Sequence, residues 1–478
     1  MIRQTAPAIG ALVGARAAVD LPGWAVLLVV AAALLLGVLG RATPAIVMVV
    51  AALASVLAVR ALAPLGVPIE EGAVDGVAVL VADPRERGRS TRVDVRHDGH
   101  RYELSAHGGV AAILAEARMG ERVLVRGHIE RGRPGDERWF RPRHVVGRIE
   151  AERVSRPIPA PGPIGAANDV RELLAGGASS LDRDDRALFL GLSIGDDRDQ
   201  TDEVRDRFRD AGLGHLLVVS GQNVAFVLAV VAPVLARLPP ASRAVAAIAV
   251  LLFFVAVTRV EPSVSRAAVM AGLAVGAELV GRPTSSLRLL STAVTGLVLV
   301  DPLLAWSLAF QLSAAATLGI VLLEAPIRRA LPGPRWATVP LSVTLAAQLG
   351  VAPLLVATFG DVPSASLPAN LLAGPVAGAV MVWGVTAGLV AGVVPDPLAA
   401  VLHLPTLVGV RWIDGVARVT TSWGLPPLGG PELVAAVAVG WSVGRRRGER
   451  RERSVARRRL GQARGAGEEL DRTKPFLE

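Results

Sequence analysis

An acidic, soluble-looking segment gives way to a long apolar run at His215-Leu-Leu-Val-Val-Ser-Gly-Gln-Asn-Val224. The polar side chains carried into this boundary are those of His215, Ser220, Gln222 and Asn223. Lipid cannot satisfy their hydrogen-bonding groups, and polar groups at membrane depth usually face the interior of a helix bundle or a water-filled path. The stretch therefore predicts a conduit that these side chains line.

The composition of the chain is that of a membrane protein. Its 478 residues are 52% hydrophobic, and the mean hydropathy of +0.47 lies far above that of a typical soluble chain. The predicted fold class is mainly α, a polytopic helical membrane protein. The chain contains no Cys, which excludes disulfides, thiolate nucleophiles and Cys-ligated zinc or iron–sulfur centres.

Membrane crossings are expected wherever about 20 apolar residues run together. Near the N-terminus, 24–40 and 44–63 predict a helical hairpin, and 6–19 is a shorter candidate interrupted by Arg16. The stretch 398–419 has a polar side, so it either crosses the membrane or lies in its interface. Further crossings are predicted near 215–238, 241–258, 263–280, 286–300, 303–323, 337–358, 364–393 and 430–444.

Between 68 and 153 the pattern changes to short alternating runs broken by turns. The runs at 74–83, 90–107 and 120–133 predict strands, and His97-Asp-Gly-His100 predicts a hairpin turn. A small five-stranded β-barrel fits this spacing, and the OB-fold is the usual barrel of this size that can meet oligonucleotides. Basic and acidic residues nearly balance here, so a structural barrel packed on the membrane domain is as well supported as a DNA-binding one.

Two polar clusters raise the question of a metal. His97, His100 and His107 lie close together in the sequence, but no further spaced ligands follow, and solvent-facing strand and turn positions are favoured. The run Asp196-Asp-Arg-Asp-Gln-Thr-Asp-Glu203 lacks the glycine and terminal Glu spacing of a calcium-binding loop. A solvated charged turn before a helix at 203–211 is favoured there, and we predict no metal site.

Polar residues also lie inside the later apolar segments. Arg266 and Glu278 share one segment, roughly 18 Å apart along a helix, and cannot pair directly. Arg266 either reaches a membrane face, where Glu261 is a candidate partner, or meets a hydrophilic path, and sequence alone leaves these alternatives open. The other polar residues of this kind are Gln311, Gln348 and Asn370. For each of them, hydrogen bonding between helices is favoured.

Most of the net charge lies at the C-terminus. From Arg445 onward the chain has twelve basic and six acidic residues, so this tail contributes +6 of the formal net charge of +9. A run of arginines directly after the last apolar segment fits the positive-inside rule and predicts a cytoplasmic C-terminus. Contacts with lipid headgroups are favoured over DNA binding for this tail.

Several motifs, taken in order, resemble those of the ComEC family of competence proteins. The strongest are Leu188-Phe-Leu-Gly-Leu-Ser-Ile-Gly-Asp196 and Phe208-Arg-Asp-Ala-Gly-Leu-Gly-His-Leu-Leu-Val-Val-Ser-Gly-Gln-Asn-Val224. Later blocks follow in the family's order and begin at Thr258, Gly281, Asp301, Phe310, Gln348 and Ala369. The resemblance covers 165–393 strongly and 24–153 more loosely, and several ordered motifs are more specific than any one of them.

The resemblance implies a channel that passes single-stranded DNA across the cytoplasmic membrane during natural transformation, with no enzymatic activity and no cofactor. The residues expected to line or shape the conduit are His215, Ser220, Gln222, Asn223, Arg266, Gln311, Gln348 and Asn370. Implied partners are single-stranded DNA, membrane lipids and other competence proteins, namely a DNA receptor, a cytoplasmic translocation ATPase and a separate nuclease. A homo-oligomer is compatible with this picture.

The expected localisation is the cytoplasmic membrane, with multiple crossings, an extracytoplasmic barrel and a cytoplasmic C-terminus. The expected organisation is N-terminal membrane helices over 1–67, an OB-like barrel over 68–155, a connector with acidic amphipathic helices over 156–213, the channel domain over 214–444 and an Arg-rich, disordered tail over 445–478.

The chain departs from the family's pattern in two respects. Many relatives have His where this chain has Asn223, which makes proton-coupled or metal chemistry there less plausible. Others have a C-terminal metallo-β-lactamase-like domain, whereas an Arg-rich tail is expected here, so strand degradation is assigned to another protein. Two further functions stay open, because a fold alone does not name the cargo: transport or export of another anionic substrate, and a membrane scaffold without transport.

Overall fold

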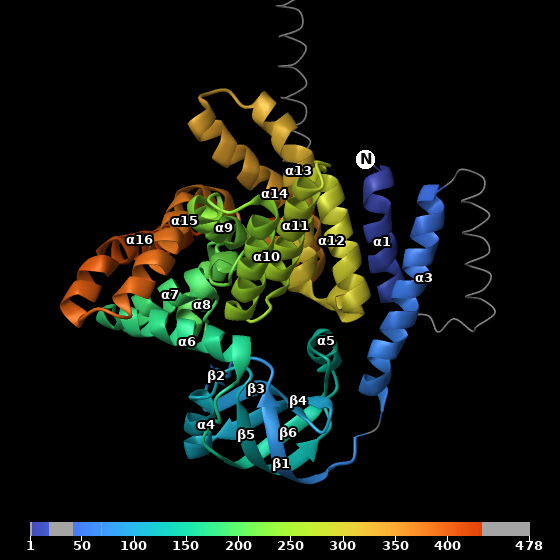
Figure 1. Ribbon diagram of the computed structural model, residues 1–478, viewed down its shortest axis with the longest axis vertical. Helices are drawn as coiled ribbons and strands as arrows, with labels where there is room; N and C mark the ends of the chain where they lie inside the picture. Colours follow the sequence, from blue (N-terminus) through green and yellow to red (C-terminus); the bar gives the residue numbers. More distant parts are fainter. Residues whose placement is uncertain (1, 19–41, 68, 433–478) are drawn as a thin grey trace, which may run out of the picture.

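A computed structural model describes residues 2–18, 42–67 and 69–432. A small β-barrel lies at one end of the molecule, and a larger domain of helices lies above it in Figure 1. The predicted crossing at 24–40, most of that at 430–444 and the Arg-rich tail from 445 onward fall outside the described residues.

The β-barrel predicted from the alternating runs is confirmed. Five strands close on one another in the order β1-β5-β6-β4-β3, because β3 also pairs with β1. All neighbouring pairs are antiparallel except β4 with β6. A short strand, β2, pairs with β3 in antiparallel orientation. A helix, α4, connects β4 to β5. Their bounds are β1 Gly72–Leu80, β2 Arg85–Arg87, β3 Ser90–His97, β4 His100–His107, α4 Gly108–Ala115, β5 Arg122–Glu130 and β6 Val145–Val154.

The barrel interior is filled by the apolar residues that alternate along each strand. Val93, Val95, Leu104, Val123 and Ile149 are all buried there, as expected when every second side chain of a strand points inward. A helix between the third and fourth barrel strands completes an OB-like barrel. The fifth strand, β6, lies in a run that the sequence patterns used above did not single out.

Three helices follow the barrel and join it to the membrane domain: α6 Gly162–Gly177, α7 Arg183–Ile194 and α8 Asp202–Asp210. Leu174, Phe189 and Phe208 are buried in one core that these helices share with later ones. Thr201 caps α8 by accepting a hydrogen bond from the Val204 amide. The acidic run before α8 is a charged turn leading into a helix, but it is not wholly solvated as predicted, because Asp196 is buried.

The helical fold class is also confirmed. Five of the described helices are long and apolar enough to cross a membrane. They include α3, α10, α13, α14 and α15, whereas α9 and α12 are shorter apolar helices. The bounds are α1 Ile2–Ala17, α3 Ala42–Leu62, α9 Gly221–Leu235, α10 Pro240–Val257, α11 Pro262–Leu279, α12 Ser286–Val300, α13 Leu308–Ala330, α14 Arg335–Phe359, α15 Ser366–Ala391 and α16 Asp396–Ser422.

Two ambiguous stretches form helices outside that set of five. The stretch 398–419 lies within α16, and 6–19 lies mostly within α1. The helix expected over 215–238 starts only at Gly221, because residues 214–216 form a 3-10 turn and Ser220 is extended. The motif is therefore divided at the start of α9. His215 and Ser220 precede the helix, and Gln222 and Asn223 lie in its first turn.

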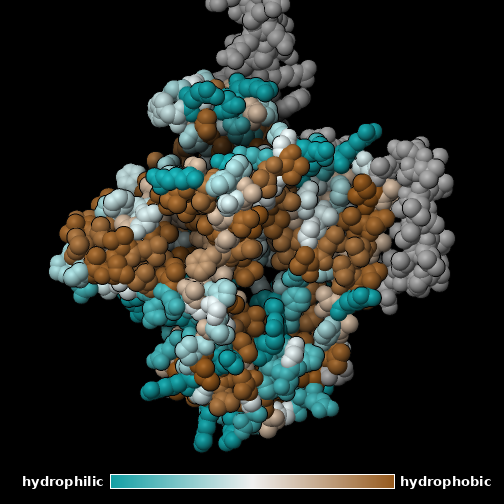
Figure 2. All heavy atoms as spheres, viewed as in Figure 1, coloured by the Kyte–Doolittle hydropathy of each residue, from teal (hydrophilic) through white to brown (hydrophobic). Residues whose placement is uncertain are grey.

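The membrane helices have one end near the barrel and one end far from it. The turn 258–261 meets the barrel through Arg259 and Asp83, and the segment 301–307 meets it through Asp301 and His144. We call this side the barrel end. The loops 236–239, 280–285 and 331–334 join the opposite ends of the same helices and define the far end. On the face seen in Figure 2, hydrophobic residues cover the helices between these two ends.

The backbones of α13 and α14 are in direct contact at two glycines. A Cβ added to Gly319 would lie 2.3 Å from the Ala346 carbonyl oxygen, and one added to Gly350 would lie 2.4 Å from the Ala315 carbonyl oxygen. No side chain fits at either position. Small residues allow this kind of close approach between membrane helices, so these two glycines fix α13 and α14 as one hairpin.

Candidate functional site

The polar motif is tied to the end of α7. The Asn223 side-chain amide donates a hydrogen bond to the Leu192 carbonyl oxygen at 2.9 Å, and the Ser220 hydroxyl donates to Asn223 Oδ1 at 3.3 Å. Asn223 is buried, whereas the side chains of Gln222 and His215 are exposed. Asn223 and Ser220 thus hold the start of α9 in place, and Gln222 and His215 lie at the surface.

Arg266 lies against this motif from α11. Its Nη2 would be 2.9 Å from a Cβ added to Gly221, so a larger residue there would push the guanidinium aside. Nε donates to the Ser313 hydroxyl at 3.0 Å, and Nη1 lies 3.1 Å from the Met270 sulfur. Arg266 is 5% exposed, and no carboxylate of the described residues lies within ion-pair distance of it. The alternative of a pair with Glu261 is therefore wrong for this conformation.

Two helix N-termini add to the positive potential at Arg266. Helices α9 and α11 both begin at the barrel end, and the Ser263 hydroxyl in the first turn of α11 donates to the Val219 carbonyl oxygen at 2.7 Å. The first amides of a helix have no acceptor within that helix, and its N-terminus attracts anions. The Ser220 side chain caps none of these amides. The arrangement favours a negatively charged ligand.

A second polar group joins three elements beside the same motif. The Gln348 amide donates to the Ser366 hydroxyl at 2.9 Å, and Asn370 Nδ2 lies 2.7 Å from the Ser366 carbonyl oxygen and 3.3 Å from that of Gly212. Gly212 has φ +71°, and a Cβ there would lie 2.4 Å from the Ser366 Cβ. The Gln348–Ser366 bond joins α14 to α15, as the sequence favoured, whereas Asn370 bonds within α15 and to the turn at Gly212.

Gln311 lies apart from both groups. Its side-chain amide donates to the Ala305 carbonyl oxygen at 2.8 Å, and Arg16 Nε donates to the same oxygen at 2.9 Å. Gln311 therefore anchors the 3-10 segment η5, Pro302–Trp306, between α12 and α13. Of the eight residues predicted from the sequence, the structure brings Ser220, Asn223 and Arg266 together, and Gln348 with Asn370.

A buried ionic junction between the barrel and the helices was not predicted. Arg171 on α6 is 2% exposed; its Nη2 lies 3.0 Å from Asp83 Oδ2 and 3.1 Å from Asp196 Oδ2. Arg259 Nε donates to the same Asp83 oxygen at 2.8 Å. Arg171 Nη1 also donates to the carbonyl oxygens of Ile194 and Val257. One arginine thereby joins the barrel, α6, α7 and α10. The Thr258-Arg-Val-Glu motif contains Arg259, one of the residues of this junction, and was the sequence signal that could have pointed to it.

The barrel makes a second attachment through the segment 131–144, which joins β5 to β6. His144 Nε2 lies 3.0 Å from Asp301 Oδ1, and the Arg141 guanidinium stacks 5.4 Å from the Trp306 ring centroid. This segment includes the short helix α5, Glu137–Phe140, which rises from the barrel toward α12 in Figure 1. Two separated contacts fix the barrel over the barrel end of the membrane helices.

The histidines do not form a metal site. His107 pairs with Glu150, His97 contacts the Val77 carbonyl oxygen, and His100 is exposed at the hairpin. In the ranges that the structure describes, no three His, Asp or Glu side chains gather in a way that could hold a metal ion.

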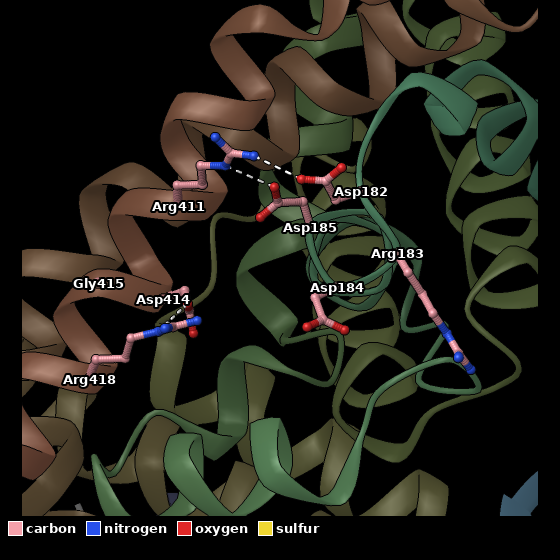
Figure 3. A pocket seen from close by; sticks show the side chains of 8 residues that line it. All are labelled: Asp182, Arg183, Asp184, Asp185, Arg411, Asp414, Gly415 and Arg418. Carbon is pink, nitrogen blue, oxygen red and sulfur yellow. Dashed lines mark hydrogen bonds and ion pairs between the residues drawn. The ribbon is translucent and has the colours of Figure 1, made fainter.

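An open pocket of about 540 Å³ lies between the start of α7 and α16. Asp182 and Asp185 point toward Arg411, and Arg418 pairs with Asp414 (Figure 3). These opposite charges form ion pairs at 2.7–3.0 Å. The pocket is therefore lined by a surface network of ion pairs, and Arg266 is not part of it.

Part of the chain is similar in sequence to known competence proteins. The family described as "Competence protein" matches residues 192–445, more than half of the chain. The ComE operon protein 3 of Bacillus subtilis (strain 168) is 31% identical over 210 residues, which are 43% of this chain and 26% of that protein. The aligned region thus spans about a quarter of the relative's length. No solved structure matches the chain. The chain belongs to the ComEC family of competence proteins.

Proposed function

We propose that this protein is a channel that passes single-stranded DNA across the cytoplasmic membrane during natural transformation. Membership of the competence family supports a role in DNA uptake, and the apolar helices support a membrane protein. The proposal assigns translocation, not catalysis, to the chain. The driving force and the degradation of the second strand are left to other competence proteins.

The observation that carries the proposal is the unpaired Arg266 at the barrel end. A buried arginine in a membrane domain is costly unless it is paired or hydrated, yet Arg266 has only a hydroxyl and a thioether as partners. The N-termini of α9 and α11 point at the same place. Backbone phosphates of a DNA strand are the anions that family membership makes most relevant, and they supply the missing counter-charge as the strand passes.

The distribution of arginines supports an extracytoplasmic barrel. In or beside the far-end loops lie Arg237, Arg243, Arg282, Arg288, Arg328, Arg329 and Arg335, against Glu278 and Glu324. In or beside the turns 258–261 and 301–307 at the barrel end lie Arg259 and Arg266, against Glu261 and Asp301. Positive loops stay in the cytoplasm, so the far end is assigned to the cytoplasm and the barrel to the outside.

Deletion of the gene from a naturally competent host tests the function. Fluorescent DNA should still bind to the cell surface, but no label should reach the cytoplasm, and the wild-type gene supplied in trans should restore passage. Unchanged transformation would exclude a DNA channel. Unchanged transformation with loss of another anionic solute's transport would favour the second function, and displacement of other membrane proteins would favour a scaffold.

Single-cysteine labelling tests the orientation, because the chain contains no Cys. His100 lies exposed at the β3–β4 hairpin, and Pro334 lies exposed in a far-end loop. In intact cells a membrane-impermeant thiol reagent should label His100→Cys and should label Pro334→Cys only after permeabilisation. The unsubstituted protein is the control for background labelling. The opposite pattern would reverse the assigned topology.

A further inference from the structure

The barrel is attached to the helices by the two loops that OB-folds commonly use for ligands. In an OB-fold the face of the second and third strands, with the loops after the first and fourth strands, binds oligonucleotides. Those strands are β3 and β4 here, and the loops are 81–89 and 131–144. The first loop carries Asp83 of the ionic junction, and the second carries His144. The usual ligand face is therefore held toward the membrane helices.

Five arginines surround two carboxylates on this face. The arginines are Arg92, Arg96, Arg101, Arg143 and Arg148, and the carboxylates are Asp94 and Glu103. Strand pairing places Asp94 opposite Glu103 and Glu103 opposite Arg148, so the carboxylates lie at the centre. We call this set the arginine face. Its net charge is positive, as expected for a surface that meets phosphates.

Asp94 and Glu103 form ion pairs with arginines that would otherwise be available to bind phosphates. Arg143 Nη1 donates to Asp94 Oδ1 at 2.9 Å, and Arg143 Nη2 donates to Glu103 Oε2 at 2.9 Å. Arg148 Nε donates to Glu103 Oε1 at 3.1 Å. Asp94 and Glu103 are largely buried, whereas 38% of the Arg143 side chain stays exposed. Arg143 can therefore turn from a carboxylate to an incoming anion without crossing the core.

The same face is electrostatically coupled to the membrane helices. Carboxylates of Asp197, Glu261 and Asp94, in that order of effect, raise the pKa of Arg85 in the loop 81–89. Asp197 and Glu261 belong to the helical part of the chain, and Asp94 belongs to the arginine face. A strand reaching Arg266 from the barrel side would pass close to these groups.

We propose that Asp94 and Glu103 act as internal substitutes for phosphate and restrain Arg143 and Arg148, so that the arginine face binds single-stranded DNA weakly. The proposal deepens the proposed function, on which it rests for the nature of the ligand. A conducting path needs sites that a permeant species can leave as well as enter. Carboxylates that compete for the same arginines lower the affinity without removing the positive charge that attracts the strand.

The test is binding of labelled oligothymidine to the full-length protein in detergent, followed by fluorescence anisotropy over a salt series. Asp94→Asn with Glu103→Gln should bind about tenfold tighter at low salt. This change frees Arg143, whereas Arg148 keeps its ion pair with Asp136 at 3.0 Å. The slope of log affinity against log salt should therefore also steepen by roughly 0.7, the contribution of one phosphate contact on a single strand. Adding Arg143→Gln to this double variant should remove most of the gain.

A matched control changes the same number of charges elsewhere on the barrel. Glu71 and Asp75 pair with Arg131 and Arg126 near β1, and all four are largely exposed. Glu71→Gln with Asp75→Asn should change affinity by less than about twofold. An equal gain in this control, or no gain in the first variant, would overturn the proposal. If the first variant does not fold, Glu103→Gln alone should still bind about threefold tighter, and its failure to do so would count equally against the idea.

The outcome is separable from that of the proposed function. If uptake depends on the gene but the carboxylate variant binds DNA no more tightly, the restraint is wrong and the channel stands. If uptake is independent of the gene while the variant still binds more tightly, the arginine face is a nucleic-acid surface and the channel is wrong.

Discussion

Arg266→Glu should reduce transformation by about 100-fold or more, whereas Arg266→Gln should reduce it by about tenfold and Arg266→Lys by only a few fold. Two unit charges 4 Å apart interact by about 4 kcal/mol at the effective dielectric of a partly buried site, and tenfold in rate corresponds to about 1.4 kcal/mol. A glutamate at this position would itself occupy the anion site at the N-termini of α9 and α11, and would then repel phosphates.

Transformation frequency at matched protein level in the membrane is the measurement. Ser313→Ala is the control, since it removes the hydroxyl that accepts from Arg266 Nε and leaves the charge in place; its effect should be small. Equal losses in the Gln and Glu variants would assign Arg266 to helix packing and would remove the observation on which the DNA channel rests.

Asp83→Ala should loosen the barrel at the ionic junction, while the second attachment through His144 and Asp301 remains. The substitution leaves Arg171 and Arg259 buried without their shared counter-ion, and breaking a buried ion pair from one side costs about 3–5 kcal/mol. The unfolding temperature of the purified protein should fall. The Pro-rich start of the connector, residues 156–161 between β6 and α6, should become sensitive to protease. Asp75→Ala removes an exposed partner of Arg126 on the same barrel and should cost less than about 1 kcal/mol.

The pH dependence of the junction follows from the same contacts. Burial alone would raise the pKa of Asp83, but Arg171 and Arg259 outweigh it and hold the pKa below its usual value. A carboxyl group of this kind stabilises the fold above its unfolded pKa of about 4 and loses that contribution as the pH falls further. Protease resistance of the connector should therefore be constant from about pH 5 to 8 in the wild type. A loss of resistance near pH 6 would show that another group controls the attachment.

Local patterns in the sequence were sufficient for much of the fold. Alternation of apolar residues in 90–107 predicts β3 and β4, because strand periodicity is set by nearest neighbours. Apolar runs predict α10, α13, α14 and α15 for a similar reason. The start of α9 was placed too early, since hydropathy cannot distinguish an apolar helix from an apolar segment of irregular backbone such as 217–220. Only the capping geometry at Ser220 shows where the helix begins.

The candidate site was predictable residue by residue, but its contacts were not. The motif marked Ser220, Asn223 and Arg266 as unusual, yet it left two alternatives for Arg266, because the partner Ser313 is 47 residues away. The ionic junction was missed for the same reason. Asp83 meets Arg171 and Arg259 across 88 and 176 residues, and each of the three lies in a segment where a solvated charge is the ordinary expectation.

The Ala305 carbonyl oxygen has a consequence for how the protein is made. It accepts hydrogen bonds from Arg16 on the first helix and from Gln311 on α13, and the first of these spans 289 residues. At synthesis rates of 5–20 residues per second, roughly 15–60 s pass between the two partners. During that interval the Arg16 guanidinium cannot donate to the Ala305 carbonyl oxygen, because that residue has not yet been synthesised. Helix α1 can pack against α3 early, because Gly14 lies directly against Ala51 of that helix. Its attachment to the middle of the membrane domain, by contrast, forms only after η5 has been synthesised.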